Sequence, residues 1–472
     1  MKNKTSYLTN NRIQIVILAI LTLAICIRIK SQGDPRLSIA NDDTLSYVSS
    51  SEVPLLSWGA FTGRRLFTTN LVYQLLKPDH GYKILVNGSS DTTKRRVQPS
   101  FVNVVLLQFF VSIIAWSVLT IAITNRLKNP IPKILGGLII ATFAFVPQIA
   151  DWDSILTSES LSFSLLALQT GLLIDLAFRF TKDTRPTWPI FTLTTIWLAI
   201  VFFWTFLKDA HLYGIIVLAM MIAASLISGK FRKQGFIYMI LLALAIFFLL
   251  GWSSSKNSAR SQIQLTNVYK SDILSDPERV EFMRAYGMPL PESPVYASWF
   301  LASAQNAYFK YLLFHPGYVI TNYFEDAPYA FFENVQTYFN TKPQFLLRKA
   351  LLPIGDILHP ENSIPILVDF LILMGILGLL FLFGIPEDMA WGWLATWMFL
   401  FANTNMFVNI FGDVNALPRH ALIATTLFRL FMWVFPIVLI DLIITFRKKP
   451  KAFRWALHTP YDQSWKDFYS CT

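Results

Sequence analysis

The feature that most constrains the fold is a series of long apolar segments separated by short polar ones. A helix needs about 20 mainly apolar residues to cross a bilayer, because the hydrocarbon layer is about 30 Å thick. A helix also satisfies its backbone hydrogen bonds within the segment, as lipid requires. The candidate segments are 13–29, 101–124, 134–149, 156–180, 189–206, 212–228, 236–252, 364–383, 389–408 and 421–446. The sequence therefore predicts an all-α integral membrane protein with about ten transmembrane helices.

The composition supports a membrane protein over a soluble one. Of 472 residues, 54% are hydrophobic and 15% are charged, whereas about 25% of an average soluble domain is charged. The formal net charge of +11 could also indicate a nucleic-acid-binding protein. The basic residues gather in short segments between apolar runs, however, where they set membrane orientation. We therefore interpret the charge as a topology signal and expect no nucleic-acid partner.

These basic segments predict how the helices are oriented. They lie in the N-terminal tail and after the second, fourth, sixth and tenth apolar runs. Their members are Arg126, Lys128, Lys133, Arg179, Lys182, Arg185, Lys230, Arg232, Lys233, Arg447, Lys448, Lys449, Lys451 and Arg454. With ten helices, all of them fall on one side, which the positive-inside rule assigns to the cytoplasm. Both termini are then predicted to be cytoplasmic.

The same arrangement divides the chain into modules. Seven predicted helices lie within 1–252, which also contains a long external loop with juxtamembrane helices at 30–100. An external helical subdomain follows at 253–363; it is rich in aromatic residues and proline, and we expect it to lie partly on the membrane. A three-helix membrane module at 364–446 and a cytoplasmic tail at 447–472 complete the chain.

The first external loop carries two adjacent carboxylates, Asp42 and Asp43, just beyond the membrane surface. A carboxylate there can act as the general base for an acceptor hydroxyl, or bind a divalent metal ion. Both residues fit equally well as a solvated turn or as the N-cap of a helix that begins near Thr44. An amphipathic run follows, whose apolar and basic residues are Leu55, Leu56, Trp58, Phe61, Arg64 and Arg65.

A short turn at 150–155 brings further carboxylates to the same side. It contains Asp151 and Asp153, and Glu159 follows within the next apolar segment. The two aspartates fit a capped, solvated turn. An ionisable side chain inside an apolar segment is costly and usually faces a cavity or a partner. A helix N-terminus would also stabilise the charge of Glu159, so a structural role stays open.

The external turn at 207–211 contains Lys208, Asp209 and His211. Lys208 and His211 are three residues apart and therefore share a helix face. The two cationic groups could hold a phosphate. The alternative is a lysine that extends from the membrane interface to water beside an aromatic belt.

The last external turn, at 409–420, contains Arg419 and His420 after Pro418. Proline is typical of the first helical position, so Arg419 is predicted at a helix N-terminus, where backbone N–H groups favour an anion. A surface Arg–His pair explains the same residues. Arg429 lies about 13 Å deeper in the membrane, and we expect a buried ion pair with Asp175 or Asp369.

These features resemble the multi-pass GT-C glycosyltransferases, which use polyprenyl-phosphate-linked sugars. The matching features are the acidic motif NDDTLSY in the first external loop, an amphipathic stretch over 53–76, and seven predicted helices before a large external loop. The segments WTFLKDAHLY, RAYGMP and GDVNALPRHAL also resemble parts of bacterial membrane proteins of this class.

The resemblance implies a multi-pass enzyme of the bacterial plasma membrane. It would transfer a sugar from a lipid-linked donor in the bilayer to an acceptor that the sequence does not identify, with inversion, on the external side. Asp42 and Asp43 occupy the catalytic position of the class. We infer from the topology a set that binds the donor phosphate, with supporting residues around it. The phosphate set is Arg64, Arg65, Lys208, His211 and Arg419, and the supporting set is Asp151, Asp153, Glu159, Asp209 and His420.

Two other functions stay open at this stage, together with one cofactor question. A transporter or lipid flippase predicts inverted repeats and broken helices that meet at the midplane, and the sequence shows no such pair of interrupted segments. A non-catalytic scaffold for assembly of the cell envelope is the other alternative. The residues assign no cofactor, and a divalent metal ion at the carboxylates is left open.

Overall fold

The computed structural model of the chain describes residues 2–87, 95–182, 187–332, 345–384, 387–413 and 415–448, with side chains from residue 11 onward. Arg185 and the predicted tail from residue 449 onward lie outside these ranges. The described chain is mostly helical and confirms the predicted all-α class. Its two short strands, β1 (Leu37–Ser38) and β2 (Arg96–Val97), pair antiparallel.

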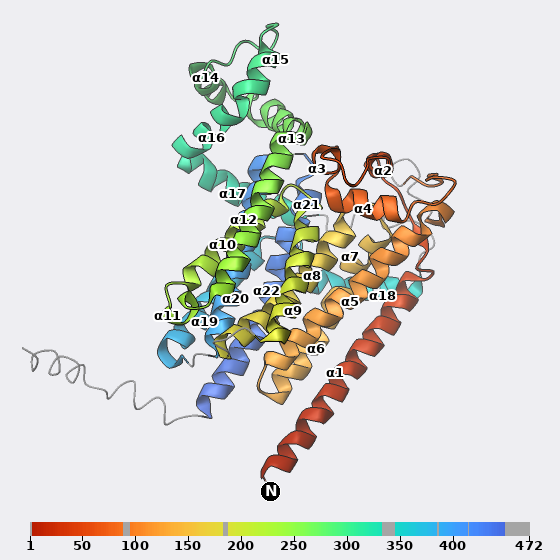
Figure 1. Cartoon of the computed structure of the whole chain (residues 1–472), viewed down its shortest axis with the longest axis vertical. Coiled ribbons are helices and arrows are strands. Elements are labelled where there is room, and N and C mark those ends of the chain that lie inside the picture. Colours follow the sequence, from red (N-terminus) through yellow and green to blue (C-terminus); the bar gives the residue numbers. More distant parts are fainter. Residues whose placement is uncertain are drawn as a thin grey trace, which may run out of the picture.

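Eight helices within the described ranges are long and apolar enough to cross a membrane. They run side by side as a bundle (Figure 1). They are α1 (Lys2–Gln32), α5 (Val102–Arg126), α8 (Glu159–Lys182), α9 (Trp188–Thr205), α12 (Gly235–Lys256), α19 (Ile364–Phe383), α20 (Met389–Gly412) and α22 (Leu422–Arg447). At Gly171 of α8, an added Cβ would lie 3.1 Å from the backbone of Leu119, so glycine permits the close approach of α5 and α8.

Two of the ten predicted transmembrane segments do not form a single long helix. α6 (Pro130–Phe145) bends by 49° relative to the helical run Pro147–Ser154, which begins with α7 (Pro147–Ala150). The bend is at Val146, where ψ is 160°, because proline disfavours helical geometry in the residue before it. α10 (His211–Ser225) has 15 residues, or about 22 Å at 1.5 Å per residue.

Shorter elements connect the bundle helices and cover one end of the bundle. The remaining helices are α2 (Thr44–Ser50), α3 (Gly59–Thr62), α4 (Phe67–Leu75), α11 (Gly229–Arg232), α13 (Arg260–Val268), α14 (Pro277–Ala285), α15 (Tyr296–Trp299), α16 (Gln305–Phe314), α17 (Pro316–Phe331), α18 (Leu346–Leu358) and α21 (Leu417–His420). Helical turns lie at η1 (Pro99–Phe101), η2 (Asp151–Ser154), η3 (Tyr269–Ile273) and η4 (Phe300–Ala304). The helices after α12 enclose an apolar cluster of their own around Tyr269, Met283 and Tyr308. The module boundaries inferred from the sequence stay predictions.

The polar turn η2 is fixed by two buried ion pairs. Asp151 accepts a hydrogen bond from Arg348 of α18 at 2.8 Å, and Asp153 pairs with Arg28 of α1. All four side chains are almost completely buried. Ser160 donates a further hydrogen bond to Asp153 at 2.6 Å. Breaking a buried pair is strongly destabilising, so these contacts hold η2 and the start of α8 in a defined position.

Arg429 of α22 is buried in the bundle but does not form the predicted ion pair. Its guanidinium donates to the carbonyl oxygens of Phe331 at 2.8 Å and Pro360 at 3.0 Å. Asp175 pairs with two other arginines, and the carboxylate of Asp369 has no hydrogen-bond partner among the described residues. The prediction was wrong because carbonyl oxygens at helix ends are also strong acceptors, and hydropathy does not show where those ends meet.

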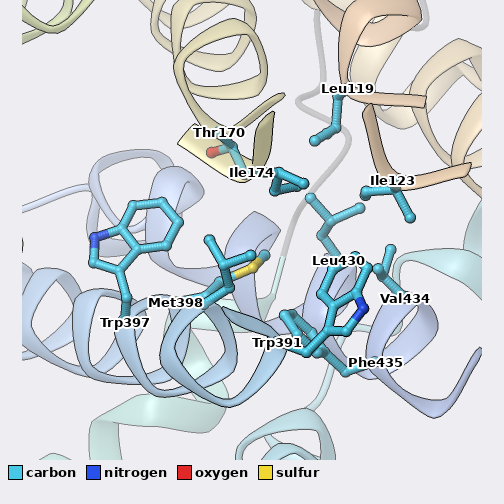
Figure 2. Close-up of a pocket in the computed structure, with 11 residues that line it drawn as sticks. Leu119, Ile123, Thr170, Ile174, Trp391, Trp397, Met398, Leu430, Val434 and Phe435 are labelled. Atoms are coloured by element: carbon cyan, nitrogen blue, oxygen red, sulfur yellow. The ribbon is translucent and has the colours of Figure 1, made fainter. Parts of the chain in front are cut away.

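A small apolar cavity lies where α5, α8, α20 and α22 meet (Figure 2). Its volume is about 20 Å³, and its lining includes Leu119, Ile174, Trp391, Met398 and Leu430. On this measure a cavity needs about 10–15 Å³ to hold a single water molecule. The cavity is therefore a packing void, too small for an organic ligand.

The two ends of the bundle carry different segments (Figure 1). The N-terminal end of α1, the short helix α11 and the C-terminal end of α22 lie at one end. The short helices α2–α4 and the helices α13–α16 lie at the other. Both external loops inferred from the sequence therefore lie together, opposite the two ends of the described chain.

We predict that the end carrying α13 faces the outside of the cell. In a background with Cys26→Ser and Cys471→Ser, Asn257→Cys should react with a membrane-impermeant maleimide in intact cells. Both Asn257 and Ser228, at the opposite end, are exposed, so Ser228→Cys is the matched control and should react only after permeabilisation. The reverse labelling pattern would show that the orientation is inverted.

Candidate active site

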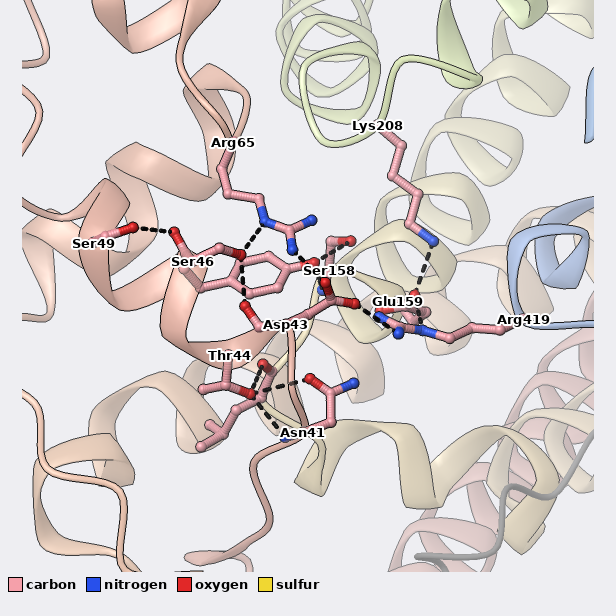
Figure 3. Close-up of polar contacts among 12 residues, drawn as sticks. Asn41, Asp43, Thr44, Ser46, Ser49, Arg65, Ser158, Glu159, Lys208 and Arg419 are labelled. Atoms are coloured by element: carbon pink, nitrogen blue, oxygen red, sulfur yellow. Dashed lines mark hydrogen bonds and ion pairs between the residues drawn. The ribbon is translucent and has the colours of Figure 1, made fainter. Parts of the chain in front are cut away.

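A network of five charged side chains lies at the end of the bundle that carries α2 and α13 (Figures 1 and 3). Asp43 accepts from Arg65 at 2.8 Å and from Arg419 at 2.7 Å. Glu159 accepts from the same Arg419 at 2.9 Å and from Lys208 at 3.0 Å. The network contains three cations and two carboxylates, so one positive charge is left uncompensated within it.

A parallel backbone pairing brings the two carboxylates together. Ile39 and Ile155 form a parallel bridge, in which the Ile39 N–H donates to Ser154 at 3.0 Å and the Ile39 carbonyl accepts from Leu156 at 3.1 Å. Asp43 and Glu159 each follow this bridge by four residues. Since the two chain segments leave the bridge in the same direction, their carboxylates arrive at the same place.

The helix α2 holds Asp43 and Arg65 in their relative positions. Thr44, at its start, donates to the carbonyl of Leu156 at 3.0 Å. Ser46 accepts from Arg65 Nε at 2.6 Å, and the Arg65 guanidinium lies 4.1 Å from the centre of the Tyr47 ring. A cation over an aromatic face is attracted by the ring quadrupole. Hydrogen bonding and stacking together fix the plane of this guanidinium.

Glu159 is the most deeply buried member of the network. Its side chain is 2% exposed, against 22% for Lys208 and 18% for Arg419. It is the first residue of α8, where the positive end of the helix dipole favours a carboxylate. The charge of Glu159 is therefore compensated from three directions, and its carboxylate holds both cations.

Asp43 is the accessible carboxylate of the network, with 38% of its side chain exposed. Burial raises the pKa of Asp43. The charges of Arg419 and Arg65 and the Arg419 hydrogen bond lower the pKa by more than burial raises it, so it lies below its usual range. Asp43 is therefore ionised at neutral pH and loses its charge only as the pH falls through that lowered pKa. Its side chain makes no capping hydrogen bond to α2.

Arg419 reaches the network from a different local structure than the sequence predicted. The last long helix, α22, begins at Leu422, and Arg419 lies before it in the single turn α21. This turn follows Ala416, which has a left-handed backbone with φ of 51°. Arg419 is therefore not at the N-terminus of a long helix, and the helix dipole expected from the sequence does not add to the charge of its guanidinium.

The adjacent candidates Asp42 and Arg64 lie outside the network. Both side chains are exposed, and no hydrogen bond or ion pair joins either of them to another described residue. Asp42, Leu45 and Ser49 are exposed at a spacing of three and four residues, which is one face of a helical turn. This spacing places Asp43 on the inner face and Asp42 on the outer one.

Two candidates near Lys208 have partners of their own. The His211 ring stacks on Trp204 with centroids 4.0 Å apart, and its Nδ1 lies 2.7 Å from the Trp204 carbonyl oxygen. Asp209 pairs with Arg260 at 2.8 Å. His211 is buried, and Asp209 faces α13, whose first residue is Arg260.

The other supporting candidates are also held elsewhere. His420 Nδ1 lies 3.2 Å from Asp413. Asp151 and Asp153 are in the buried ion pairs of η2. Among the predicted residues, the structure thus brings together Asp43, Glu159 and three cations. In residues 11–87, 95–182, 187–332, 345–384, 387–413 and 415–448, no three His, Cys, Asp or Glu side chains gather closely enough to hold a metal ion.

Sequence reasoning missed Ser46, Tyr47 and Arg260. The first two lie within the motif NDDTLSY and could have been found from helical spacing, since both follow Asp43 by about one turn. Arg260 follows an apolar segment by a few residues and belongs to no motif. Its partners lie in two other external segments, which the sequence alone does not relate to it.

Comparison with known proteins gives a similarity in fold. The sequence matches no protein-family model and no curated protein. The structure is similar to the archaeal oligosaccharyltransferase AglB from Archaeoglobus fulgidus, solved with an inhibitory peptide and a dolichol-phosphate. The two are 14% identical with a TM-score of 0.39, and the match covers 92% of this chain and 51% of that one. This chain spans about half the length of AglB, and a similarity of this size carries no functional argument.

Proposed function

We propose that this protein is a membrane glycosyltransferase of the GT-C type. It takes a sugar from a polyprenyl-phosphate donor and transfers it to an acceptor hydroxyl on the external side of the bacterial plasma membrane, with both termini in the cytoplasm. The observation that carries the proposal is the network of Asp43, Glu159, Arg65, Lys208 and Arg419 at one end of a membrane bundle. It combines a base with an anion site where a lipid-borne substrate can reach both.

The three cations suit the phosphate of such a donor. Arg65 and Arg419 are 23% and 18% exposed, so both side chains are partly exposed while their carboxylate partners hold them in place. Arginine binds phosphate through two parallel hydrogen bonds, and Lys208 adds a third positive charge. Negative charge grows on the phosphate as it leaves the sugar, and fixed cations stabilise that charge most at the transition state.

Asp43 is placed to accept the proton of the acceptor. The acceptor oxygen forms a bond to the anomeric carbon as the bond from that carbon to the phosphate oxygen breaks. The bonding electrons remain on the phosphate, and the hydroxyl proton passes to the Asp43 carboxylate. Attack on the face opposite the phosphate inverts the anomeric centre. The lowered pKa of Asp43 keeps it ionised before the reaction; the exposed neighbour Asp42 is the alternative base.

The segment between α2 and α4 supports a lipid-linked donor. Leu56 is fully exposed and Trp58 is 46% exposed, although both lie a few residues before Arg65. Tryptophan is typical of the membrane interface, where its ring spans apolar and polar layers. Exposed apolar residues in the segment that leads to Arg65 suit a molecule with a hydrocarbon tail and a charged head.

The experiment that tests the proposal is a transfer assay with purified protein. The protein is incubated with a panel of polyprenyl-phosphate sugars and candidate acceptors, and the products are identified by mass spectrometry. The proposal expects one donor to lose its sugar and yield the polyprenyl phosphate. A panel that remains unchanged, while the protein is shown to be folded, contradicts the proposal.

We predict that Asp43→Asn abolishes transfer and that Asp42→Asn does not. Asparagine keeps the size of the side chain but cannot accept a proton, and loss of a general base costs ~100- to 10,000-fold in rate. Asp42 lies on the exposed face and is the matched control. The turnover rates of the two variants in the transfer assay show which aspartate is the base. Near-normal turnover in Asp43→Asn would show that Asp43 is not the base, so that the base is Asp42 or a residue outside this pair.

We also predict that Arg419→Ala weakens donor binding more than Lys208→Ala does. Arg419 contacts both carboxylates, whereas Lys208 contacts Glu159 alone. Loss of a charge-assisted contact costs about 1.5–3 kcal/mol, or roughly 10- to 100-fold in affinity. Titration with a short-chain polyprenyl phosphate measures this, with Lys77→Ala, in an exposed pair with Glu52, as the neutral control. A larger loss for Lys208→Ala would contradict the ranking.

A further inference from the structure

Arg260 is partly buried and links segments of the chain that lie next to the network. It is not itself a residue that the proposed reaction requires. It is the first residue of α13, and its guanidinium donates to the Asp209 carboxylate at 2.8 and 3.1 Å and to the Ser254 hydroxyl at 3.1 Å. It also donates to the carbonyl oxygens of Phe61, at 3.2 Å, and Gly63. A guanidinium has five N–H groups. All of them are used, so Arg260 has no donor left for a ligand.

The partners of Arg260 adjoin two of the three cations of the network. Asp209 directly follows Lys208, and Gly63 precedes Arg65 by two residues. One side chain from the external helices thus joins the turn between α9 and α10 to the end of α3. No contact within the network does this, because Lys208 is bonded to Glu159 and Arg65 to Asp43 and Ser46.

The segment before Arg65 needs such support. α3 has four residues, far fewer than an isolated helix needs in water. The last carbonyl groups of a helix have no partner within it, and here Arg260 supplies donors for two carbonyls at this end. Arg260 is 12% exposed and Asp209 21%, so the charged pair is largely shielded from water. Lysine cannot reproduce a planar set of five donors.

We propose that Arg260 is a positioning residue of the anion site: it holds the segments that carry Lys208 and Arg65 so that both cations face the same phosphate. The identity of the anion rests on the proposed function. We call the contacts by which Arg260 joins these two segments the clamp, and the clamp is observed independently of any ligand. Its effect reaches the substrate through Lys208 and Arg65, which makes Arg260 distinct from the residues that bind or react.

The first measurement tests, without any ligand, whether Arg260 holds the two segments in place. Hydrogen–deuterium exchange of the full-length protein in detergent is compared for the wild type, Arg260→Ala, Arg260→Lys and Arg284→Ala. Arg284 is an exposed arginine of α14 and serves as the control. In both Arg260 variants, the backbone around residues 59–66 and 206–212 should exchange faster, on the order of tenfold, as local opening becomes easier. Unchanged exchange in these segments overturns the clamp.

The second measurement uses farnesyl phosphate as the probe. Its affinity should fall on the order of tenfold in Arg260→Ala, with Arg260→Lys giving no rescue and Arg284→Ala no change. If the wild type binds the probe and Arg260→Ala binds it equally well, despite faster exchange, the positioning role is overturned. If the wild type binds no phosphate, the proposed function fails, and the exchange data alone decide whether Arg260 holds the two segments.

Discussion

The site depends on one buried carboxylate, Glu159, at the N-terminal end of α8. An ionised side chain in such a position is costly unless partners compensate its charge. Lys208 and Arg419 provide that compensation at 3.0 and 2.9 Å, and they come from the turn after α9 and from the turn before α22. Glu159 therefore draws together helices that are far apart in the chain. Arg419 then continues the network to Asp43.

The arrangement separates the charges that hold the site from those that can act. Glu159 and the ion pairs of η2 are almost completely buried and keep the start of α8 in place. Asp43, Arg65 and Arg419 are partly exposed, so they are the charges available to a substrate. In the proposed reaction, a phosphate at the network meets one uncompensated positive charge beside an ionised carboxylate. That combination suits transfer of a group away from a phosphate.

The sequence predicted the all-α membrane fold because each long apolar segment by itself indicates a transmembrane helix. It also singled out all five members of the network, since charged residues at the ends of apolar segments on one side are few and conspicuous. It could not choose between Asp42 and Asp43, or between Arg64 and Arg65, because neighbouring residues differ only in the helical face they occupy. It missed Arg260 and misassigned the partners of Arg429, because both bind backbone carbonyl groups from distant segments.

The central claim is that this network receives the phosphate of a lipid-linked sugar. The most direct measurement is an electron cryomicroscopy structure of the protein with a bound polyprenyl phosphate. The account predicts that the phosphate lies within hydrogen-bonding distance of Arg65, Lys208 and Arg419, with the hydrocarbon chain passing from there into the bilayer. A phosphate held elsewhere in the protein, with the ion pairs of Asp43 and Glu159 undisturbed, would contradict the account.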